Sequence, residues 1–125
     1  MPLNFLGLRT AIYKVDDIIL AKEWYAEILG FAPYFDEPFY VGFNIGGYEL
    51  GLQPAAISDE VKTTNVTAYW GVHDVKAAYS QLLKHGATPY EEPADVGGGI
   101  TVATVLDPWG NAFGLIHNPH FSLPG

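Results

Sequence analysis

The sequence predicts an α+β fold built from two copies of one βαβββ unit, because two separate segments of the chain recur. TAIYKVDDIILA at residues 10–21 resembles TAYWGVHDVKAA at residues 67–78, at a constant offset of 57. GYELGLQ at residues 47–53 resembles GNAFGLI at residues 110–116, at an offset of 63. Both pairs occur in the same order along the chain, which indicates an internal duplication.

Each copy of the first segment reads as a strand followed by a helix. The copies begin with alternating β-branched and aromatic residues, a pattern typical of a strand. Asp17 and Asp74 come next, where a carboxylate can accept hydrogen bonds from the first N–H groups of a helix. Apolar residues then recur with a helical period until a glycine ends the pattern. Helices are therefore predicted near residues 17–29 and 74–85.

Each helix leaves room for two more strands before the closing strand of its copy. These are predicted at about residues 31–36, 39–45, 87–91 and 100–106. A unit of roughly 60 residues buries little surface alone, so the two copies, or the copies of two chains, should pack together, and residues 1–125 are expected to form a single domain. Module one then covers about residues 7–54 and module two about 64–119. We expect curved mixed sheets, related by a pseudo-twofold axis, whose concave faces enclose a ligand cavity.

The composition limits the classes of partner and the compartment. The chain has 14 acidic and 6 basic residues and a net charge of −8, which argues against nucleic acid or anionic membranes as partners. It has no cysteine, so disulfides and thiolate metal sites are excluded. Neither a secretory signal nor a stretch of about 20 apolar residues is evident, so a cytoplasmic protein is expected.

Three segments together resemble a known superfamily. VDDIILAKEWYAEILGF, VHDVKAAYSQLLKHGA and LDPWGNAFGLI are similar to sequences of the glyoxalase, bleomycin-resistance and extradiol-dioxygenase (vicinal oxygen chelate) superfamily. The resemblance extends from about residue 7 to residue 118, and the turn from Asp107 to Asn111 is its most specific part. One fold of this kind supports many functions, so function has to be argued from the site.

Enzymes of this superfamily usually hold a divalent metal through four side chains, one from the first and one from the last strand of each module. The resemblance assigns these positions to Thr10, Gly51, Thr67 and Gly114. None of the four offers an imidazole or a carboxylate, and a neutral hydroxyl is a poor ligand for zinc, nickel or iron. The resemblance therefore implies a member without a metal or other cofactor.

The expected binding site contains these four positions and their neighbours. Strand alternation places Ile12 and Tyr69 on the faces of Thr10 and Thr67, and both Glu49 and Gln53 on the face of Gly51. Which of the two polar residues points into the cavity stays open. Trp109 and the aromatic residues between 34 and 43 are expected to line the wall. The predicted ligand-binding residues are Thr10, Ile12, Glu49, Gly51, Gln53, Thr67, Tyr69, Trp109 and Gly114.

The four histidines are assigned structural roles. His73 precedes the helix-capping Asp74, and His117 and His120 lie at or beyond the end of the last strand. His85 falls in the last turn of the second helix, where it is expected to stabilise the helix end through the dipole.

Three functions remain as hypotheses. The favoured one is a metal-free protein that binds an aromatic or cationic small molecule. It would be a homodimer that resembles bleomycin-resistance proteins and sequesters an antibiotic or an aromatic metabolite. The alternative is a metal-dependent lyase, isomerase or dioxygenase of the glyoxalase I type. The third is a metal-free enzyme with Glu49 as general base. The favoured hypothesis also predicts open space at Gly51 and Gly114, where a bulky side chain would block the ligand with little loss of stability.

Overall fold

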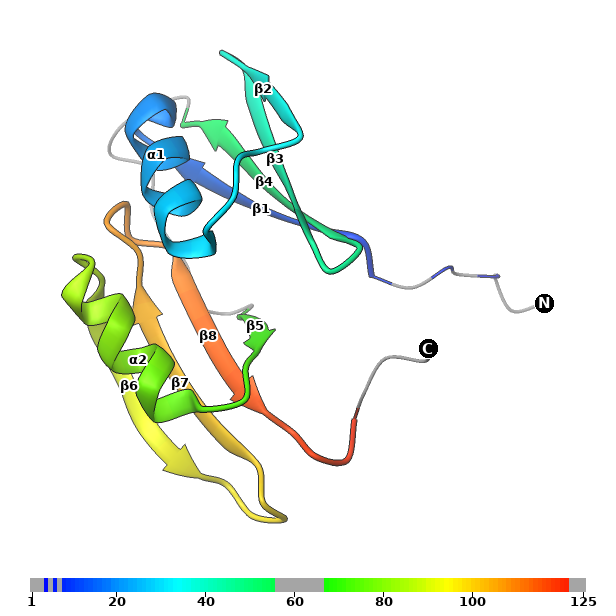
Figure 1. The fold of residues 1–125 in the computed structure, drawn as a ribbon, viewed down its shortest axis with the longest axis vertical. Coiled ribbons are helices and arrows are strands. Elements are labelled where there is room, and N and C mark those ends of the chain that lie inside the picture. The colour runs from blue at the N-terminus through cyan, green and yellow to red at the C-terminus, as the bar shows by residue number, and fades with distance from the viewer. Residues whose placement is uncertain (1–3, 5, 7, 56–66, 122–125) are drawn as a thin grey trace. The chain divides into compact units, whose positions relative to one another are not determined.

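The structure, a computed structural model, describes residues 4, 6, 8–55 and 67–121 (Figure 1). The chain divides into two compact units, Met1–Glu60 and Val61–Gly125. Each unit contains one helix and one four-stranded mixed sheet, in the order strand, helix and three strands. The predicted duplicated βαβββ fold is confirmed.

The first unit consists of β1 (Thr10–Val15), α1 (Ile18–Leu29), β2 (Phe35–Glu37), β3 (Tyr40–Ile45) and β4 (Tyr48–Pro54). Its strand order is β1-β4-β3-β2, with β1 parallel to β4 and the other neighbours antiparallel. The helix α1 lies against β3 and β4 (Figure 1). It covers one face of the sheet, and the opposite face is left open within this unit.

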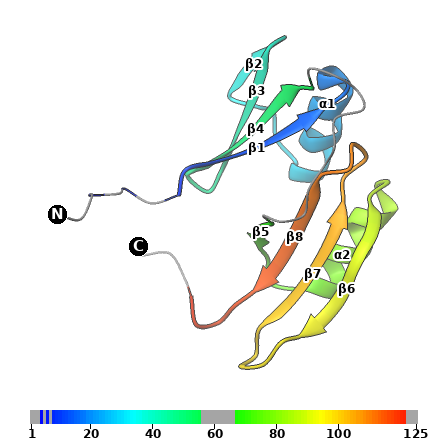
Figure 2. The same ribbon diagram turned by 180° about the vertical axis from the view of Figure 1, so that it is seen from behind.

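The second unit repeats this arrangement with β5 (Ala68–Gly71), α2 (Val75–Lys84), β6 (Thr88–Asp95), β7 (Thr101–Leu106) and β8 (Ala112–His117). Its strand order is β5-β8-β7-β6, and again only the first and last strands of the unit pair in parallel. The helix α2 contacts β6, β7 and β8, and Figure 2 shows these three strands in front of it.

The strand register confirms the duplication residue by residue. Ile12 pairs with Gly51 across β1 and β4, and Tyr69 pairs with Gly114 across β5 and β8. The offset of 57 takes Ile12 to Tyr69, and the offset of 63 takes Gly51 to Gly114. Both repeats read from the sequence therefore describe the same parallel pairing.

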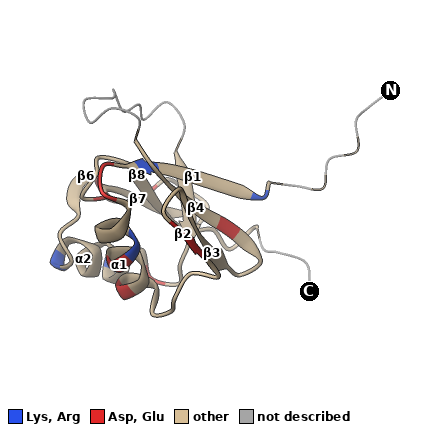
Figure 3. Cartoon of the chain, turned by 90° about the horizontal axis from the view of Figure 1, so that it is seen from above, with Lys and Arg blue, Asp and Glu red and all other residues tan. Residues whose placement is uncertain are grey.

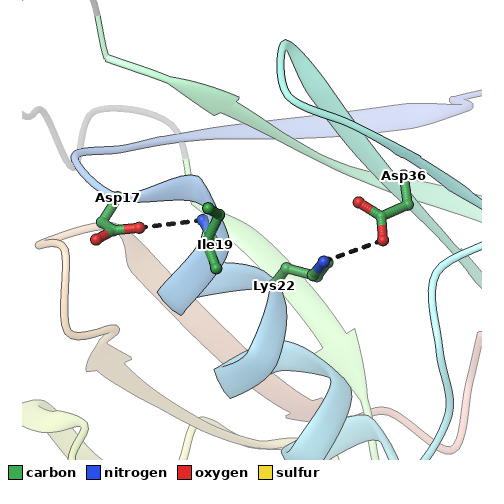
Figure 4. Close-up of polar contacts among 4 residues, drawn as sticks. All are labelled: Asp17, Ile19, Lys22 and Asp36. Atoms are coloured by element: carbon green, nitrogen blue, oxygen red, sulfur yellow. Dashed lines mark hydrogen bonds and ion pairs between the residues drawn. The ribbon is translucent and has the colours of Figure 1, made fainter.

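The helices begin and end where the sequence predicts. One carboxylate oxygen of Asp17 accepts hydrogen bonds from the N–H groups of Ile19 and Leu20, each at 3.1 Å (Figure 4). Asp74 accepts one from Ala77 at 3.0 Å. Gly30 ends α1 in the left-handed conformation, at φ 84°, which a residue without a Cβ adopts at no steric cost.

Each hydrophobic core lies between the helix and one face of its sheet. In the first unit the buried side chains are those of Tyr13, Val15, Ala21, Tyr25, Val41, Phe43, Leu50 and Leu52. In the second, Trp70 stacks on Phe113 with ring centroids 4.3 Å apart, close to buried Leu115. In the first unit these side chains follow a period of two in the strands, so its sheet has a covered face and an open one. In the second unit, consecutive residues of β7 and β8 are buried.

An ion pair fixes α1 to the edge of its sheet. Lys22 Nζ lies 3.0 Å from a carboxylate oxygen of Asp36 on β2 (Figure 4). The two helices differ in charge, since α1 carries Lys22, Glu23 and Glu27, whereas α2 carries two lysines and no acidic residue (Figure 3). Among the described residues, no helix has the length and apolar character needed to cross a membrane.

Two strand boundaries differ from the prediction. The strand β2 is confined to Phe35–Glu37, since Pro33 has no N–H group to donate to a ladder. The strand β6 continues to Asp95, beyond the predicted end at residue 91. It is an edge strand with two register shifts, and its prolines Pro89 and Pro93 lie at these shifts, where a missing donor is tolerated.

The cap at Asp17 provides a test of the helix boundary. Asp17→Ala should lower the free energy of unfolding by about 1 kcal/mol, because two N–H groups of the first turn lose their acceptor. Urea unfolding followed by circular dichroism measures the loss. Asp16→Ala removes the same charge from the adjacent exposed position and serves as the control. An equal loss in both variants would show that the charge matters and the cap does not.

Candidate functional site

Five of the predicted site residues share the open face of the first sheet. On β1, exposed Thr10 and Ile12 alternate with residues that face the core. On β4, Glu49, Gly51 and Gln53 alternate in the same way with buried leucines. The register places Thr10 beside Glu49 and Ile12 beside Gly51. The strand alternation read from the sequence is therefore correct for this unit.

The carboxylate of Glu49 is the centre of a cluster of hydroxyl groups on this face. Thr10 Oγ1 donates a hydrogen bond to Glu49 Oε1 at 3.1 Å, and the Tyr34 hydroxyl donates to Oε2. The Tyr40 hydroxyl is hydrogen-bonded to the same carboxylate. We refer to Thr10, Tyr34, Tyr40 and Glu49 as the Glu49 cluster. Its members come from β1, from the residue before β2, from β3 and from β4.

Two glycines make room for the tyrosines of the cluster. A Cβ atom on Gly42 would lie 2.7 Å from Glu49 Oε2 and 3.0 Å from the Tyr34 ring. A Cβ atom on Gly51 would overlap the phenol of Tyr40. The space at Gly51 is therefore occupied by the Tyr40 side chain, and the prediction of open space there is wrong.

The electrostatics of the cluster follow from its hydrogen bonds. The bond from Tyr34, together with those from Tyr40 and Thr10, lowers the pKa of Glu49. The same bond raises the pKa of Tyr34. Burial, followed by the hydrogen bond to Glu49, raises the pKa of Tyr40 to about 12. At neutral pH the cluster thus contains one ionised carboxylate held by neutral hydroxyl donors.

A pocket of about 220 Å³ adjoins the cluster on the open face. It is lined by Arg9, Thr10, Tyr34, Asn44, Gly47, Tyr48 and Glu49 and is open to solvent. Of the two polar residues that the sequence leaves as alternatives, Glu49 lines this pocket and Gln53 does not. The pocket combines a carboxylate, a guanidinium group and phenol rings, which are groups that bind polar organic molecules.

The predicted residues of the second unit also come together, but they leave no open space. A Cβ atom on Gly114 would lie 2.7 Å from the Tyr69 ring, 2.9 Å from the carbonyl oxygen of Ala68 and 3.0 Å from the Thr67 methyl group. Because one of these atoms belongs to the backbone, the position cannot accept a side chain without moving β5. The prediction that Gly114 tolerates a bulky residue is wrong.

Trp109 lies in the turn between β7 and β8. The backbone N–H of Trp109 donates a hydrogen bond to a carboxylate oxygen of Asp107 at 3.0 Å. The buried Asp107 also accepts one from the backbone N–H of Asn111 at 2.8 Å. The Asn111 side chain adds a third bond, at 3.1 Å. The turn that carries much of the superfamily resemblance is thus held by one buried carboxylate, and Trp109 is part of that structural unit.

The residues at the superfamily's metal-ligand positions do not fit a metal. Thr10 and Thr67 offer only hydroxyls, and Gly51 and Gly114 have no side chain and lie beneath tyrosine rings. Such a donor set suits neither zinc nor iron. Within residues 8–55 and 67–121, no three His, Asp or Glu side chains are grouped so that they could hold an ion.

Two histidines have local partners. His85 follows the last residue of α2, and its Nδ1 lies 2.9 Å from the carbonyl oxygen of Gln81, as expected for a residue that stabilises a helix end. His120 Nε2 lies 2.6 Å from the carbonyl oxygen of Gly98. Both contacts are structural.

Six residues of the pocket and cluster were not among the predicted ligand-binding residues: Arg9, Tyr34, Tyr40, Asn44, Gly47 and Tyr48. Of these, only Tyr34 and Tyr40 were expected near the site, as part of an aromatic wall. The alternation of Tyr40, Gly42 and Asn44 along β3 was a usable signal, because it places all three on one face. Tyr34 reaches the cluster from the segment before β2, which strand periodicity does not describe.

The sequence profile described as the Glyoxalase/Bleomycin resistance protein/Dioxygenase superfamily matches residues 8–115. The chain belongs to this superfamily, as the resemblance implied. Among curated proteins, none matches this sequence.

Solved structures show the same fold at low sequence identity. A glyoxalase-related enzyme from Fulvimarina pelagi superposes with a TM-score of 0.76 at 17% identity, covering 97% of this chain and 94% of the other. A glyoxalase/bleomycin resistance protein/dioxygenase from Nocardioides gives 0.73 at 19%, covering 99% and 91%. A family enzyme from Burkholderia phytofirmans PsJN gives 0.69 at 21%, covering 86% and 95%. Identities this low establish the fold alone.

The contacts of Gly114 predict a stability difference between two glycines of the second sheet. Gly114→Ala should lower the free energy of unfolding by about 1–3 kcal/mol, because the added methyl meets the Ala68 carbonyl. Gly71→Ala on β5 is the matched control, since a Cβ atom there meets nothing within 4 Å. Urea unfolding of both variants measures the difference. Equal stability of the two would mean that the space above Gly114 is open.

The Glu49 cluster should stabilise the fold within a limited pH window. The lowered pKa of Glu49 contributes stability above its ordinary value of 4.5, and this is lost as pH falls through the folded-state value. The raised pKa of Tyr40 contributes stability below 10, and this is lost as pH rises towards about 12. The contribution of the cluster is therefore complete only between these limits.

The alkaline limit can be observed directly. In Glu49→Gln, Tyr40 loses its charged acceptor, so its pKa should fall below about 12, and it should stay above the ordinary value of 10 because burial, the larger cause, is unchanged. Tyrosinate absorbance, recorded while circular dichroism confirms that the protein is folded, should reach completion at lower pH in this variant. Tyr40→Phe should remove one late-titrating tyrosine and leave Tyr34, whose pKa is also raised. An unchanged titration in Glu49→Gln would show that the carboxylate does not bond the phenol.

Proposed function

We propose that this protein binds a small organic molecule without a metal, at the pocket beside the Glu49 cluster. One observation carries the proposal: an ionised carboxylate, held by three hydroxyl groups on an open sheet face, lines a pocket. Ordering these groups before a ligand arrives lowers the entropic cost of binding. Sequestration of an antibiotic or an aromatic metabolite would be a function of this kind.

The pocket supports an aromatic or cationic ligand. The Tyr34 side chain is 65% exposed and that of Tyr48 is 38% exposed, so ring faces are accessible to a flat group. The ionised Glu49 favours a positive charge, and a cation over a tyrosine ring gains further stabilisation.

The chemistry of the residues disfavours two other functions. A metal-dependent lyase, isomerase or dioxygenase would need ligands that Thr10, Gly51, Thr67 and Gly114 do not provide. A metal-free enzyme with Glu49 as general base would benefit from a pKa near neutrality. The pKa of Glu49 is instead lowered by its hydroxyl donors, which makes the carboxylate a weaker base.

The proposal predicts that binding and stability are independent of metal. Purified protein should hold no stoichiometric zinc, nickel, manganese or iron by elemental analysis, and a chelator should leave the melting temperature unchanged. A bound structural metal would raise that temperature by mass action, so its removal would be visible. Tight stoichiometric metal together with turnover of a hemithioacetal or catechol would replace this proposal with the enzyme alternative.

A ligand screen tests the site itself. A library of aromatic and cationic compounds, screened by thermal shift, should yield compounds that raise the melting temperature of the wild type. Glu49→Gln should weaken their binding. Glu37→Gln, which removes an exposed carboxylate from β2, should not. A site at Glu49 would be refuted if no compound of the library bound, or if the compounds that bind had the same affinity for Glu49→Gln and Glu37→Gln.

We also propose that the protein is a cytoplasmic homodimer. Short members of the superfamily commonly build each cavity from two chains, and Phe35 and Phe39 are large apolar side chains exposed to solvent. A second copy that covered such residues would remove apolar surface from water. Light scattering at micromolar concentration should then give about twice the chain mass of 13.6 kDa. A mass of one chain would contradict the dimer.

A further inference from the structure

The pocket beside the Glu49 cluster contains two opposite charges. Arg9 immediately precedes β1, and its carbonyl oxygen accepts a hydrogen bond from the Glu49 N–H at 2.8 Å, so the two residues are neighbours across the parallel pair. Both line the pocket. Among the described residues, however, Arg9 has no carboxylate within ion-pair distance, which leaves its guanidinium group available to a ligand.

The polar groups of the pocket have unequal capacity left for hydrogen bonding. Asn44 Oδ1 accepts from the Gly47 N–H at 2.8 Å, so the Asn44 side chain retains its two amide N–H donors. Arg9 adds the donors of its guanidinium group. An ionised carboxylate has about four acceptor positions, and Glu49 uses three of them for Thr10, Tyr34 and Tyr40. One acceptor position therefore remains beside a group of donors.

Building on the binding function proposed above, we propose that the ligand is a compact zwitterion carrying an ammonium and a carboxylate group. The ammonium group binds the remaining acceptor position of Glu49. The carboxylate binds the guanidinium group of Arg9, with the Asn44 amide as a second donor. The rings of Tyr34 and Tyr48 contact the apolar part of the molecule.

Charge and size both favour this class. A ligand with only a positive charge is attracted by Glu49 but repelled by Arg9, and one with only a negative charge is attracted by Arg9 but repelled by Glu49. A zwitterion satisfies both residues and leaves neither charge uncompensated. The volume of about 220 Å³ is below the ~300–1,000 Å³ typical of sites for drug-sized molecules, so the part of the ligand that the pocket holds is compact.

Three probes that share one ring separate these possibilities. L-phenylalanine carries both charges, 2-phenylethylamine only the positive one and 3-phenylpropionate only the negative one. Their affinities for the full chain are measured by NMR titration at neutral pH and low ionic strength, where screening is weak. L-phenylalanine should bind about two- to fivefold more tightly than either singly charged probe, the gain expected for one more partly exposed ion pair.

Substitutions assign each charge to its partner. Arg9→Gln should weaken the binding of L-phenylalanine and 3-phenylpropionate and leave that of 2-phenylethylamine unaffected or tighter. Glu49→Gln should weaken the binding of L-phenylalanine and 2-phenylethylamine and leave that of 3-phenylpropionate unaffected or tighter. Lys76→Gln on α2 and Glu37→Gln on β2 each remove one charge of the same sign from a residue that does not line the pocket. They are the matched controls and are expected to bind all three probes as the wild type does.

The outcomes distinguish this inference from the proposed function. If 2-phenylethylamine binds at least as tightly as L-phenylalanine, or if Arg9→Gln changes nothing, the zwitterion assignment is wrong. If no probe binds while the screened library yields ligands that Glu49→Gln weakens, the ligand class is wrong and the binding site stands. If neither the probes nor the library bind, both proposals fail.

Discussion

The parallel pairing of the first and last strands in each unit is the constraint on which the rest of the structure depends. Parallel neighbours cannot be joined by a tight turn, so the chain must cross over between them, and the crossover contains the helix. That helix covers one face of the sheet and leaves the other open. The same pairing sets Thr10 beside Glu49 and Arg9 next to the pocket. Fold and candidate site thus arise from one register.

On the open faces, tyrosine rings cover the two glycines that the superfamily resemblance assigns to metal-ligand positions. Tyr40 lies over Gly51 in the first unit, and Tyr69 lies over Gly114 in the second. In the first unit the ring also delivers a hydroxyl to Glu49. The first sheet therefore presents a carboxylate surrounded by neutral hydroxyl donors on its open face.

The fold was predictable from the sequence because the duplication shows itself twice, and Asp17 and Asp74 mark both helix starts. The residues that face the open side of β1 and β4 were predictable as well, since strands have a period of two. The occupation of the space at Gly51 was not predictable. Strand alternation shows which face of the sheet a residue lies on, but it does not show how far the side chains of neighbouring strands extend over that face. Tyr40 lies diagonally across the β3–β4 pair from Gly51, and its ring covers the glycine. Tyr34 comes from a segment without periodicity.

The ring over Gly51 also bears on which residues position 51 can accept. A glutamate or histidine introduced there would meet the phenol of Tyr40, so the tyrosine side chain would have to turn away to admit it. A smaller residue at position 40 would make the same room, but it would also remove one of the hydroxyl groups that donate a hydrogen bond to Glu49. The packing of one ring thus couples residues 40, 49 and 51, so that none of the three can be exchanged without altering the surroundings of the other two.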